Sequence, residues 1–300
     1  MIDLHLHTTA SDGALSPAEL LKKAEGLGLQ MISVTDHFTV KGYKELKDPA
    51  VRSLYSGKLL PGCEYSAHYK DLSIEILGFG IRIDDAAPFL EKRYGTTLQE
   101  KWAIELDKMM EHYRSKGYPF DERAVREHFA KEGNSARFCM TKELFAHPEN
   151  RQRLLYPEAA ENGSVFLRKE YSNPESAYFF PAHFLHAEAK EVCDEIHRLG
   201  GLAVLAHPLK YNPAFERVLE EMLREVPLDG LEAWYGSNTA EQREYLLQLC
   251  RKYDLIYSGG SDFHNPKREN SGGVKMGMAH LKDVFPTQTI LEFFKDLPTL

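Results

Sequence analysis

Short apolar segments alternate with helical patterns along most of this 300-residue chain, and this alternation limits its fold more than any other feature. Two neighbouring parallel strands need a crossover connection, which a helix usually supplies. Strands that alternate with helices therefore predict parallel β/α units, and their number here predicts a β/α barrel of the α/β class. The strands are expected at residues 2–6, 31–35, 58–67, 72–81, 201–208, 228–235 and 255–262.

The first helix has clear signals at both of its ends. In SPAELLKKAEGLG, Ser16 is placed to cap the helix, Pro17 to occupy its first position and Glu19 to complete a capping box. Glycines follow the last apolar residue and favour the end of the helix there.

The middle of the chain breaks the alternation of strands and helices. From about Tyr94 to Phe184 the sequence is charged, helical and aromatic, as in LQEKWAIELDKMMEHYRSKG, and it contains no convincing buried strand. We therefore expect the barrel at residues 1–93 and 185–300, with a helical insertion, or lid domain, at residues 94–184.

Composition excludes several classes of protein. The formal net charge of −8 is spread along the chain and disfavours stable binding of a nucleic-acid backbone. A membrane span needs a run of about 18 apolar residues, and none is present. The four cysteines form no C-x-x-C pair, which is typical of reduced thiols in a cytoplasmic protein. We expect a cytoplasmic protein that is a monomer or a small homo-oligomer.

Metal-ligating residue types recur at the carboxyl ends of the predicted strands. His5 and His7 are two residues apart on the first strand, so their side chains point to the same face. In β/α barrels the carboxyl end of the strands carries the active site. The other residues of this kind at strand ends are His37, Glu64, His207, Asp262 and His264.

Each of these residues alone has an ordinary explanation. A lone H-x-H is more often a pair of structural histidines than a pair of ligands, and Asp262 alone could cap the segment after SGGS. Chance placement of five or six such residues at the same end of successive strands is a much weaker explanation. Their joint pattern therefore predicts a site for several metal ions.

Five motifs occur in the order that is typical of one family: DLHLHTTASDG, VTDH, PGCEYSA, LAHP and GGSDFH. By these motifs the chain resembles the PHP (polymerase and histidinol phosphatase) family, and within it the branch that acts on nucleoside 5′-monophosphates or 3′,5′-bisphosphates. The resemblance implies a distorted (β/α)7 barrel with up to three divalent metal ions at its carboxyl rim.

The resemblance also implies a set of ligands. His5, His7, Glu64 and Asp262 match the ligands of the first metal, and Glu64 bridges to a second metal that His207 binds. Asp12, His37 and His264 match the ligands of the third. A mixed imidazole and carboxylate set suits two or three ions of manganese, zinc or iron.

One position departs from the family pattern. The family usually has a histidine before ILG as a further ligand of the second metal, whereas SIEILGFG supplies Glu75. A carboxylate can bind a metal, and its negative charge favours manganese or magnesium. The other interpretation is that the second metal position is weakly filled.

Three further residues are predicted to contact the substrate phosphate. NSARFCMTKELF resembles the segment that lies over the metals in this branch, which places Ser135 and Arg137 near the phosphate. Lys210 follows His207 by three residues and supplies a second cation. For Arg137 and Lys210, solvated surface charge is the alternative interpretation.

These features predict a metal-dependent phosphoesterase that hydrolyses a phosphate monoester of a small metabolite, a nucleotide, by a metal-activated water. Arg137 would hold the phosphate, and His264 or Asp12 would protonate the leaving group. Three alternatives stay open: an exonuclease or oligonucleotide phosphodiesterase, an amidohydrolase-type hydrolase, and an inactive metal-stabilised regulatory module. No membrane partner is expected.

Overall fold

The computed structural model describes residues 1–95, 98–131, 135–181, 186–211, 213–267 and 274–300. Its strands coincide closely with the apolar segments of the sequence. They are β1 (Ile2–Leu6), β2 (Met31–Val34), β3 (Lys58–Tyr69), β4 (Leu72–Phe79), β5 (Ala187–Glu188), β6 (Leu202–Leu205), β7 (Gly230–Tyr235) and β8 (Ile256–Gly260).

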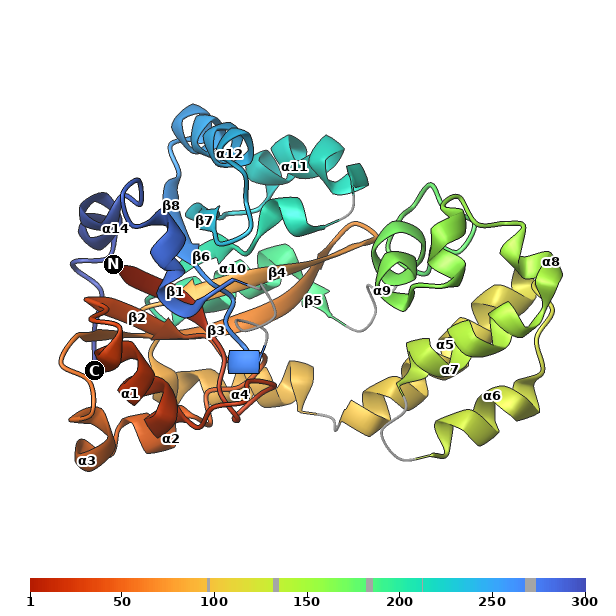
Figure 1. The fold of residues 1–300 in the computed structure, drawn as a ribbon, viewed down its shortest axis with the longest axis horizontal. Helices are drawn as coiled ribbons and strands as arrows, with labels where there is room; N and C mark the ends of the chain where they lie inside the picture. The colour runs from red at the N-terminus through yellow and green to blue at the C-terminus, as the bar shows by residue number, and fades with distance from the viewer. Residues whose placement is uncertain (96–97, 132–134, 182–185, 212, 268–273) are drawn as a thin grey trace.

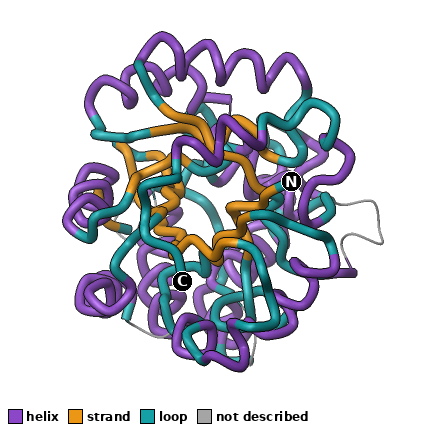
Figure 2. Tube along the Cα trace, turned by 90° about the vertical axis from the view of Figure 1, so that its left-hand side faces the viewer, coloured by secondary structure: helices purple, strands orange, loops and turns teal. Residues whose placement is uncertain are grey.

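Seven of these strands form a nearly closed barrel (Figure 2). Their order around the sheet is β1-β2-β3-β4-β6-β7-β8, and the short β5 pairs with β3 outside this path. The first and last strands approach each other through a bridge between Leu6 and Phe263, where the His7 amide donates to the Phe263 carbonyl over 3.0 Å. The predicted fold class, a distorted (β/α)7 barrel, is confirmed.

One strand differs from the expected parallel arrangement. β3 and β4 form an antiparallel hairpin whose link is only Lys70 and Asp71, and β4 is also antiparallel to β6. Two residues are too few for the crossover that a parallel pair requires. Because β4 runs in the opposite direction, the early residues of this strand lie at the rim where the parallel strands end.

Helices surround the barrel (Figure 1). The capping box at Ser16 and Glu19 is present as predicted, and α1 begins at Pro17. None of the described helices is both long enough and apolar enough to cross a membrane. The helical elements of the barrel are α1 (Pro17–Gly26), α2 (Tyr43–Leu46), α3 (Pro49–Arg52), α4 (Ile83–Tyr94), α10 (Ala189–Arg198), η4 (Pro208–Lys210), α11 (Pro213–Glu225), α12 (Ala240–Tyr253), η5 (Met276–Leu281) and α14 (Thr287–Phe293).

A second group of helices projects from one side of the barrel (Figure 1). These helices have a hydrophobic cluster of their own, which includes Met109, Tyr113 and Tyr178. We therefore propose that residues 94–184 form a separate helical insertion; its expected end at residues 184 and 185 lies outside the described residues. The helical elements are α5 (Leu98–Ser115), α6 (Glu122–Phe129), α7 (Ala136–Ala146), α8 (Pro148–Arg151), η1 (Pro157–Ala160), α9 (Gly163–Phe166) and η2 (Leu167–Tyr171).

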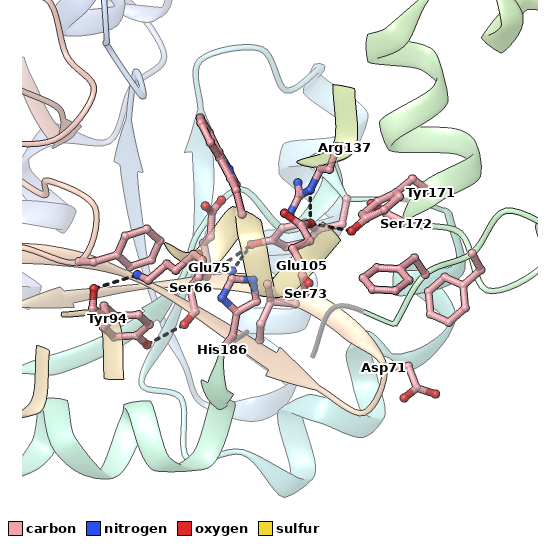
Figure 3. A pocket seen from close by; sticks show the side chains of 17 residues that line it. Ser66, Asp71, Ser73, Glu75, Tyr94, Glu105, Arg137, Tyr171, Ser172 and His186 are labelled. Carbon is pink, nitrogen blue, oxygen red and sulfur yellow. Dashed lines mark hydrogen bonds and ion pairs between the residues drawn. The ribbon is translucent and has the colours of Figure 1, made fainter. Parts of the chain in front are cut away.

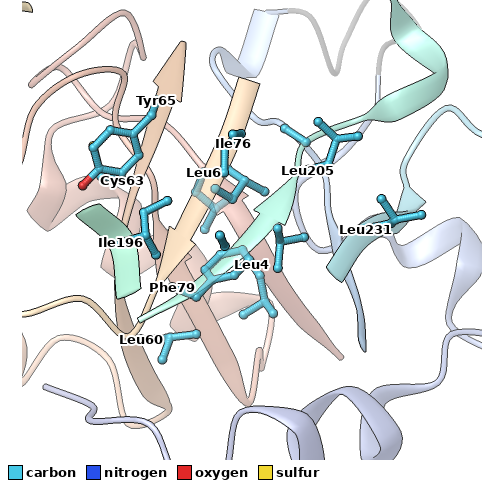
Figure 4. Packing of buried hydrophobic residues seen from close by; sticks show 14 of the residues in the cluster. Leu4, Leu6, Leu60, Cys63, Tyr65, Ile76, Phe79, Ile196, Leu205 and Leu231 are labelled. Carbon is cyan, nitrogen blue, oxygen red and sulfur yellow. The ribbon is translucent and has the colours of Figure 1, made fainter. Parts of the chain in front are cut away.

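The barrel is stabilised by a larger hydrophobic cluster that joins its strands to the surrounding helices (Figure 4). Leu4 and Leu6 of β1 are fully buried in this cluster and pack with residues such as Leu205 and Leu231. Burial of a leucine side chain contributes about 1.5–3 kcal/mol to folding. The alternation along β1 therefore leaves its leucines for packing and its histidines for a polar site.

Candidate metal centre

All nine predicted metal ligands lie at one rim of the barrel. Each comes from a strand, or from the loop that follows a strand, so the fold brings together residues that are up to 259 positions apart between His5 and His264. Eight of them fall into three overlapping groups of ligand atoms, each close enough to share one ion, and His207 lies beside Glu64 and Glu75 of one group.

The first group contains His5, His7, Glu64 and Asp262, whose ligand atoms all lie within 4.8 Å of one another. The Nε2 atoms of His5 and His7 lie 3.1 and 3.2 Å from Glu64 Oε2. The same two atoms lie 3.5 and 3.4 Å from Asp262 Oδ1. Two imidazole nitrogens and two carboxylate oxygens thus face a common point.

Glu64 also faces a second group. His207 Nε2 lies 3.4 Å from Glu64 Oε1 and 3.2 Å from Glu75 Oε2. His37 Nδ1 lies 3.2 Å from Glu64 Oε2 and 3.9 Å from Glu75 Oε1. Glu75 is therefore placed among ligand-type atoms, although it stands where the family usually has histidine.

The third group contains His7, Asp12, His37 and His264. Asp12 Oδ2 lies 3.3 Å from His264 Nε2, and Asp12 Oδ1 lies 3.7 Å from His7 Nδ1 and 3.9 Å from His37 Nε2. His7 presents Nε2 to the first group and Nδ1 to the third, which joins the two groups.

Several donor atoms of the centre have no hydrogen-bond partner among the residues that the structure describes, which is consistent with a role as metal ligands. Five buried side-chain atoms, namely His7 Nδ1 and Nε2, His37 Nδ1, Glu64 Oε1 and His207 Nδ1, make no hydrogen bond within the structure. Buried polar atoms are normally satisfied. Most of these atoms lie 3.2–3.7 Å from an opposite partner without hydrogen-bond geometry. Neutral imidazole and carboxylate ligands that converge in this way fit divalent cations.

Comparison with known proteins supports the resemblance to the PHP family. The PHP domain model matches residues 3–254, which is most of the chain. The chain belongs to the PHP domain family. As a PHP protein it is a metal-dependent phosphoesterase, and such enzymes use divalent metal ions.

Several relatives of this PHP chain act on different phosphate esters. A 5′-3′ exoribonuclease from Haemophilus influenzae is 29% identical over 92% of both chains. A phosphoribosyl 1,2-cyclic phosphate 1,2-diphosphodiesterase from Eggerthella lenta is 28% identical over 87% of this chain and 93% of the relative. A 3′,5′-nucleoside bisphosphate phosphatase from Chromobacterium violaceum is 26% identical over 95% and 93%.

A solved structure supports the fold of this PHP chain. A protein from Bifidobacterium adolescentis, described as a metal-dependent phosphoesterase, superposes with a TM-score of 0.54 at 26% identity. The match covers 88% of this chain and 87% of that protein.

Carboxylates shift the pKa values of the buried histidines in the metal-free centre. Burial lowers the pKa of His7, but the nearby carboxylates of Asp262 and Glu64 outweigh this effect and raise it to about 9. Burial also lowers the pKa of His207, and Glu64 and Glu75 raise it to about 9. Without metal these imidazoles hold protons near pH 7, so metal binding must displace them.

The histidines in turn keep the carboxylates ionised. Burial raises the pKa of Glu64, but the charges of His5 and His37 outweigh it and hold the pKa well below its usual range. The pKa of Asp12 is raised by partial burial and lowered more strongly by His264, to about 2. Both carboxylates are therefore available as anionic ligands at neutral pH.

Glu232 is a buried partner of two predicted metal ligands, and the motifs did not reveal it. This fully buried carboxylate on β7 lies 3.0 Å from His5 Nδ1 and accepts a hydrogen bond from the His207 amide over 2.9 Å. A carboxylate behind a ligating histidine fixes its orientation and increases its basicity. The available signal was a charged residue inside the apolar strand GLEAWY.

Asp36 organises the loop that carries Asp12. It accepts hydrogen bonds from the Thr8 amide over 2.7 Å, the Thr8 hydroxyl over 2.6 Å and the Ser11 hydroxyl over 2.6 Å. The VTDH motif thus supplies His37 to the centre and, through Asp36, supports the loop between β1 and α1.

Three residues in or beside the centre have left-handed backbone conformations. Their φ angles are 27° at His207, 53° at Asp262 and 56° at Phe38, which follows His37. Such conformations are costly for residues other than glycine and cluster at functional sites, although Lys70, Asp254 and Met278 adopt them elsewhere in this chain.

Lys210 lies beside the first group of ligands. Its ammonium is 2.6 Å from Asp262 Oδ2, and the Tyr235 hydroxyl donates to the same oxygen over 3.0 Å. This leaves Asp262 Oδ1 to face His5 and His7. The side chain of Lys210 is 45% exposed, so it lies at the surface of the rim, and its contact to substrate stays a prediction.

Arg137 lies in the wall of a cavity of about 390 Å³ that also includes Glu75 (Figure 3). Its Nε donates to the buried Glu105 over 2.6 Å, and its guanidinium lies over the Tyr171 ring. Ser135 caps α7, because its hydroxyl accepts a hydrogen bond from the Phe138 amide over 3.2 Å. The structure thus brings Arg137 to the cavity and uses Ser135 for the helix on which Arg137 lies.

Proposed function

We propose that this PHP enzyme hydrolyses a phosphate monoester of a small nucleotide, a nucleoside monophosphate or 3′,5′-bisphosphate. The main support is that Glu75 belongs both to the second ligand group and to the wall of the 390 Å³ cavity. Cavities of roughly 300–1,000 Å³ bind small molecules. A phosphate at the ligand groups would leave the rest of a nucleotide in this cavity.

The residues that would hold the metals are the three groups of ligand atoms. The first is His5, His7, Glu64 and Asp262; the second is Glu64, Glu75, His207 and His37; and the third is Asp12, His37, His264 and His7. When bound, divalent ions at such a site stabilise charge on phosphate oxygens and lower the pKa of a water molecule.

The side chains around these groups orient the substrate and supply a proton. Lys210 and Arg137 provide the two cations for phosphate oxygens, and the planar guanidinium suits bidentate contact. Asp12 is ionised near neutral pH because its pKa is lowered to about 2, chiefly by His264 against the opposing effect of burial. An ionised carboxylate cannot donate a proton, so of the two predicted donors only His264 can protonate the leaving group, and only when its Nε2 carries a proton rather than a metal ion.

A second candidate function is 5′-3′ exonucleolytic cleavage of RNA. The observation that favours it is the 29% identity to the Haemophilus influenzae exoribonuclease over almost the full length of both chains. The cavity between the barrel and the insertion would then receive the terminal nucleotide. The net charge of −8 argues against extended contacts to an RNA backbone.

Product analysis distinguishes these two functions. The manganese-loaded protein is incubated with adenosine 5′-monophosphate, adenosine 3′,5′-bisphosphate and a short 5′-phosphorylated RNA, and released phosphate and mononucleotides are quantified. Rapid phosphate release from the mononucleotides with slow RNA shortening is the proposed result. Rapid RNA shortening with no phosphate release from the mononucleotides would replace it with the exonuclease.

A matched pair of variants tests the role of Arg137 in the same assay. Arg137→Ala is expected to raise KM by roughly tenfold or more with a smaller change in kcat, if it holds the ground-state phosphate. Arg126→Ala is the control, because Arg126 lies on α6 and forms exposed pairs with Glu122 and Asp107. Unchanged KM and kcat in Arg137→Ala would remove this residue from the site.

A further inference from the structure

The cavity beside the metal centre extends away from Glu75 into the junction between the barrel and the insertion (Figure 3). The hairpin β3–β4 provides Ser66 and Ser73, α5 provides Trp102, and the segment after η2 provides Phe179. Glu75, a predicted metal ligand, thus lines the cavity together with residues that, apart from Arg137, have no assigned role.

Two aromatic side chains of this cavity differ from the others. Phe38 and Tyr94 stack on each other with ring centroids 4.9 Å apart, and Tyr171 lies 5.6 Å from Phe180. Within the ranges that the structure describes, Trp102 and Phe179 line the cavity without a ring–ring contact. Both are partly buried and line the cavity, where an aromatic ring can stack on a planar ligand, and Trp102 also packs against the hydrophobic cluster of the insertion.

The charged groups of the cavity are largely paired within it. Glu105 is almost fully buried and accepts hydrogen bonds from Arg137 Nε over 2.6 Å and from the Tyr171 hydroxyl over 2.8 Å. Lys101 donates to the Tyr94 carbonyl over 2.8 Å. Beyond these pairs and the carboxylates of Asp71 and Glu75, the wall offers aromatic side chains and serine hydroxyls, which suit a neutral planar group with polar edges.

His186 adds an uncharged polar side chain to the wall of the cavity. It lines the cavity at the point where the chain returns to the barrel. Burial, together with the smaller effect of the Arg137 charge, lowers the pKa of His186 to about 4. Its ring is therefore uncharged near pH 7 and can donate one hydrogen bond and accept another.

We propose that this part of the cavity is a nucleobase subsite, in which the ring faces of Trp102 and Phe179 hold the base of a substrate whose phosphate lies at the ligand groups beside Glu75. This inference rests on the proposed function, since it assigns the non-reacting end of the same substrate. Trp102 is then a specificity-determining residue, because it contacts the base and no reacting atom.

Two substrates that differ only by the base test this subsite. Adenosine 5′-monophosphate and ribose 5-phosphate carry the same phosphate ester. Stacking of one base on an aromatic side chain corresponds to about a 5- to 150-fold change in binding. Trp102→Leu is expected to lower kcat/KM for adenosine 5′-monophosphate within this range and to leave ribose 5-phosphate within about twofold. Equal losses on both substrates, or no loss on the nucleotide, would overturn the proposal.

A control variant separates recognition from folding. Phe129 is a partly buried aromatic residue that packs against the same hydrophobic cluster as Trp102 but does not line the cavity. Phe129→Leu is expected to leave kcat/KM unchanged for both substrates. If Phe129→Leu reproduces the selective loss seen with Trp102→Leu, the effect arises from insertion packing and the subsite is contradicted.

Fluorescence gives a readout that does not depend on activity. The chain has two tryptophans, and Trp234 is buried in the barrel beside Phe285 with ring centroids 5.5 Å apart. Titration of adenosine 5′-monophosphate into the full-length protein is expected to quench fluorescence in the wild type and not in Trp102→Leu. Quenching without phosphate release from either substrate would refute the proposed function but keep the subsite, whereas equal quenching in Trp102→Leu would refute the subsite.

Cleavage of a 5′-phosphorylated dinucleotide distinguishes whether the base in the subsite belongs to a free nucleotide or to the end of an RNA. Selective loss of dinucleotide cleavage in Trp102→Leu, with ribose 5-phosphate unaffected, assigns the subsite to the terminal base of an RNA. Selective loss with adenosine 5′-monophosphate assigns it to a free nucleotide. Either loss supports stacking on Trp102, and the absence of both overturns it.

Discussion

Glu75 replaces the histidine that is usual at its position in the family, yet its carboxylate lies 3.2 Å from His207 Nε2 and 3.9 Å from His37 Nδ1. A carboxylate at this position adds a negative charge and a harder oxygen ligand to the second group. Oxygen ligands favour manganese or magnesium, whereas imidazole favours zinc. The residue type at position 75 is therefore expected to set the metal preference of the second group.

Glu75→His is expected to shift this preference toward zinc, by roughly tenfold in the zinc-to-manganese ratio. The measurement is the metal content of protein equilibrated with equal zinc and manganese and then separated from free ions. Ser73→His is the control, because Ser73 lines the cavity two residues earlier on the same strand and belongs to no ligand group. An unchanged ratio in Glu75→His would show that Glu75 does not bind the ion.

Glu232→Gln is expected to weaken metal binding by about 10- to 100-fold with little change in the fold. The amide keeps the shape of the carboxylate but lowers the basicity of His5, whose Nδ1 lies 3.0 Å away. Titration calorimetry with manganese measures the change. Glu143→Gln, at another buried glutamate in the insertion, serves as the control. Equal affinities in the two variants would contradict the role of Glu232.

Most residues of the centre could be predicted because their types and strand-end positions are visible in the sequence. Glu232 could not be predicted from the motifs, because its role depends on a contact with His5, which lies 227 residues away in the sequence. The same holds for Asp36, whose hydrogen bonds to Thr8 and Ser11 form only when two loops meet.

Local sequence signals were sufficient to predict features that depend on one helix or strand alone, such as the start of a helix. The helix α1 begins at Pro17 behind its capping box, as predicted. The direction of β4 was not predicted, because its apolar pattern is the same in parallel and antiparallel strands. The two-residue link of Lys70 and Asp71 was the available signal for a hairpin.

The close approach of β8 to β1 leaves no room for a side chain at Gly260. A Cβ atom at Gly260 would lie 2.3 Å from His5 Cβ and 2.7 Å from the His5 amide nitrogen. Gly260→Ala is therefore expected to destabilise the protein by about 1–3 kcal/mol and to weaken metal binding through displacement of His5. Urea unfolding and manganese titration measure the two effects.

The matched control is Gly26→Ala at the end of α1. A Cβ atom there would meet no atom within 4 Å, and alanine favours a helix more than glycine does. Gly26→Ala is expected to be neutral or slightly stabilising. Equal stability of the two variants would contradict the steric account of Gly260.

At the scale of the whole molecule, the barrel and the insertion have separate hydrophobic clusters, and the cavity lies where they meet. The sequence predicted a barrel, because strands alternate with helices, and a helical insertion, because the middle of the chain is charged and helical without a buried strand. It could not predict the contacts of Glu105 with Arg137 and Tyr171, which lie 32 and 66 residues away. Such contacts depend on how the insertion helices pack, which periodicity does not specify.

The metal-free molecule is expected to lose stability as the pH rises from 7 to 9. Burial lowers the pKa of His7 and His207, but carboxylates raise both to about 9, above the value of about 6.5 in an unfolded chain. In this range the folded state holds protons that the unfolded state has released, so rising pH favours unfolding. Calorimetry in a chelator should show Tm falling by about 5 °C.

The metal-loaded protein is the control for this pH dependence. Bound ions displace the same protons, so its Tm should not fall over the same range. A Tm of the metal-free protein that is constant or rising from pH 7 to 9 would contradict the coupling between the histidines and the carboxylates.

We propose that the three ligand groups form one metal centre that hydrolyses a phosphate ester of a nucleotide. Phosphate release from adenosine 5′-monophosphate and adenosine 3′,5′-bisphosphate, measured together with metal content, tests it most directly. The wild type is expected to hold two or three divalent ions and to release phosphate, and His7→Ala to lose at least about 100-fold of this activity, because His7 joins two groups. Wild-type protein that holds its metals and releases no phosphate, or His7→Ala with unchanged activity, would contradict the claim.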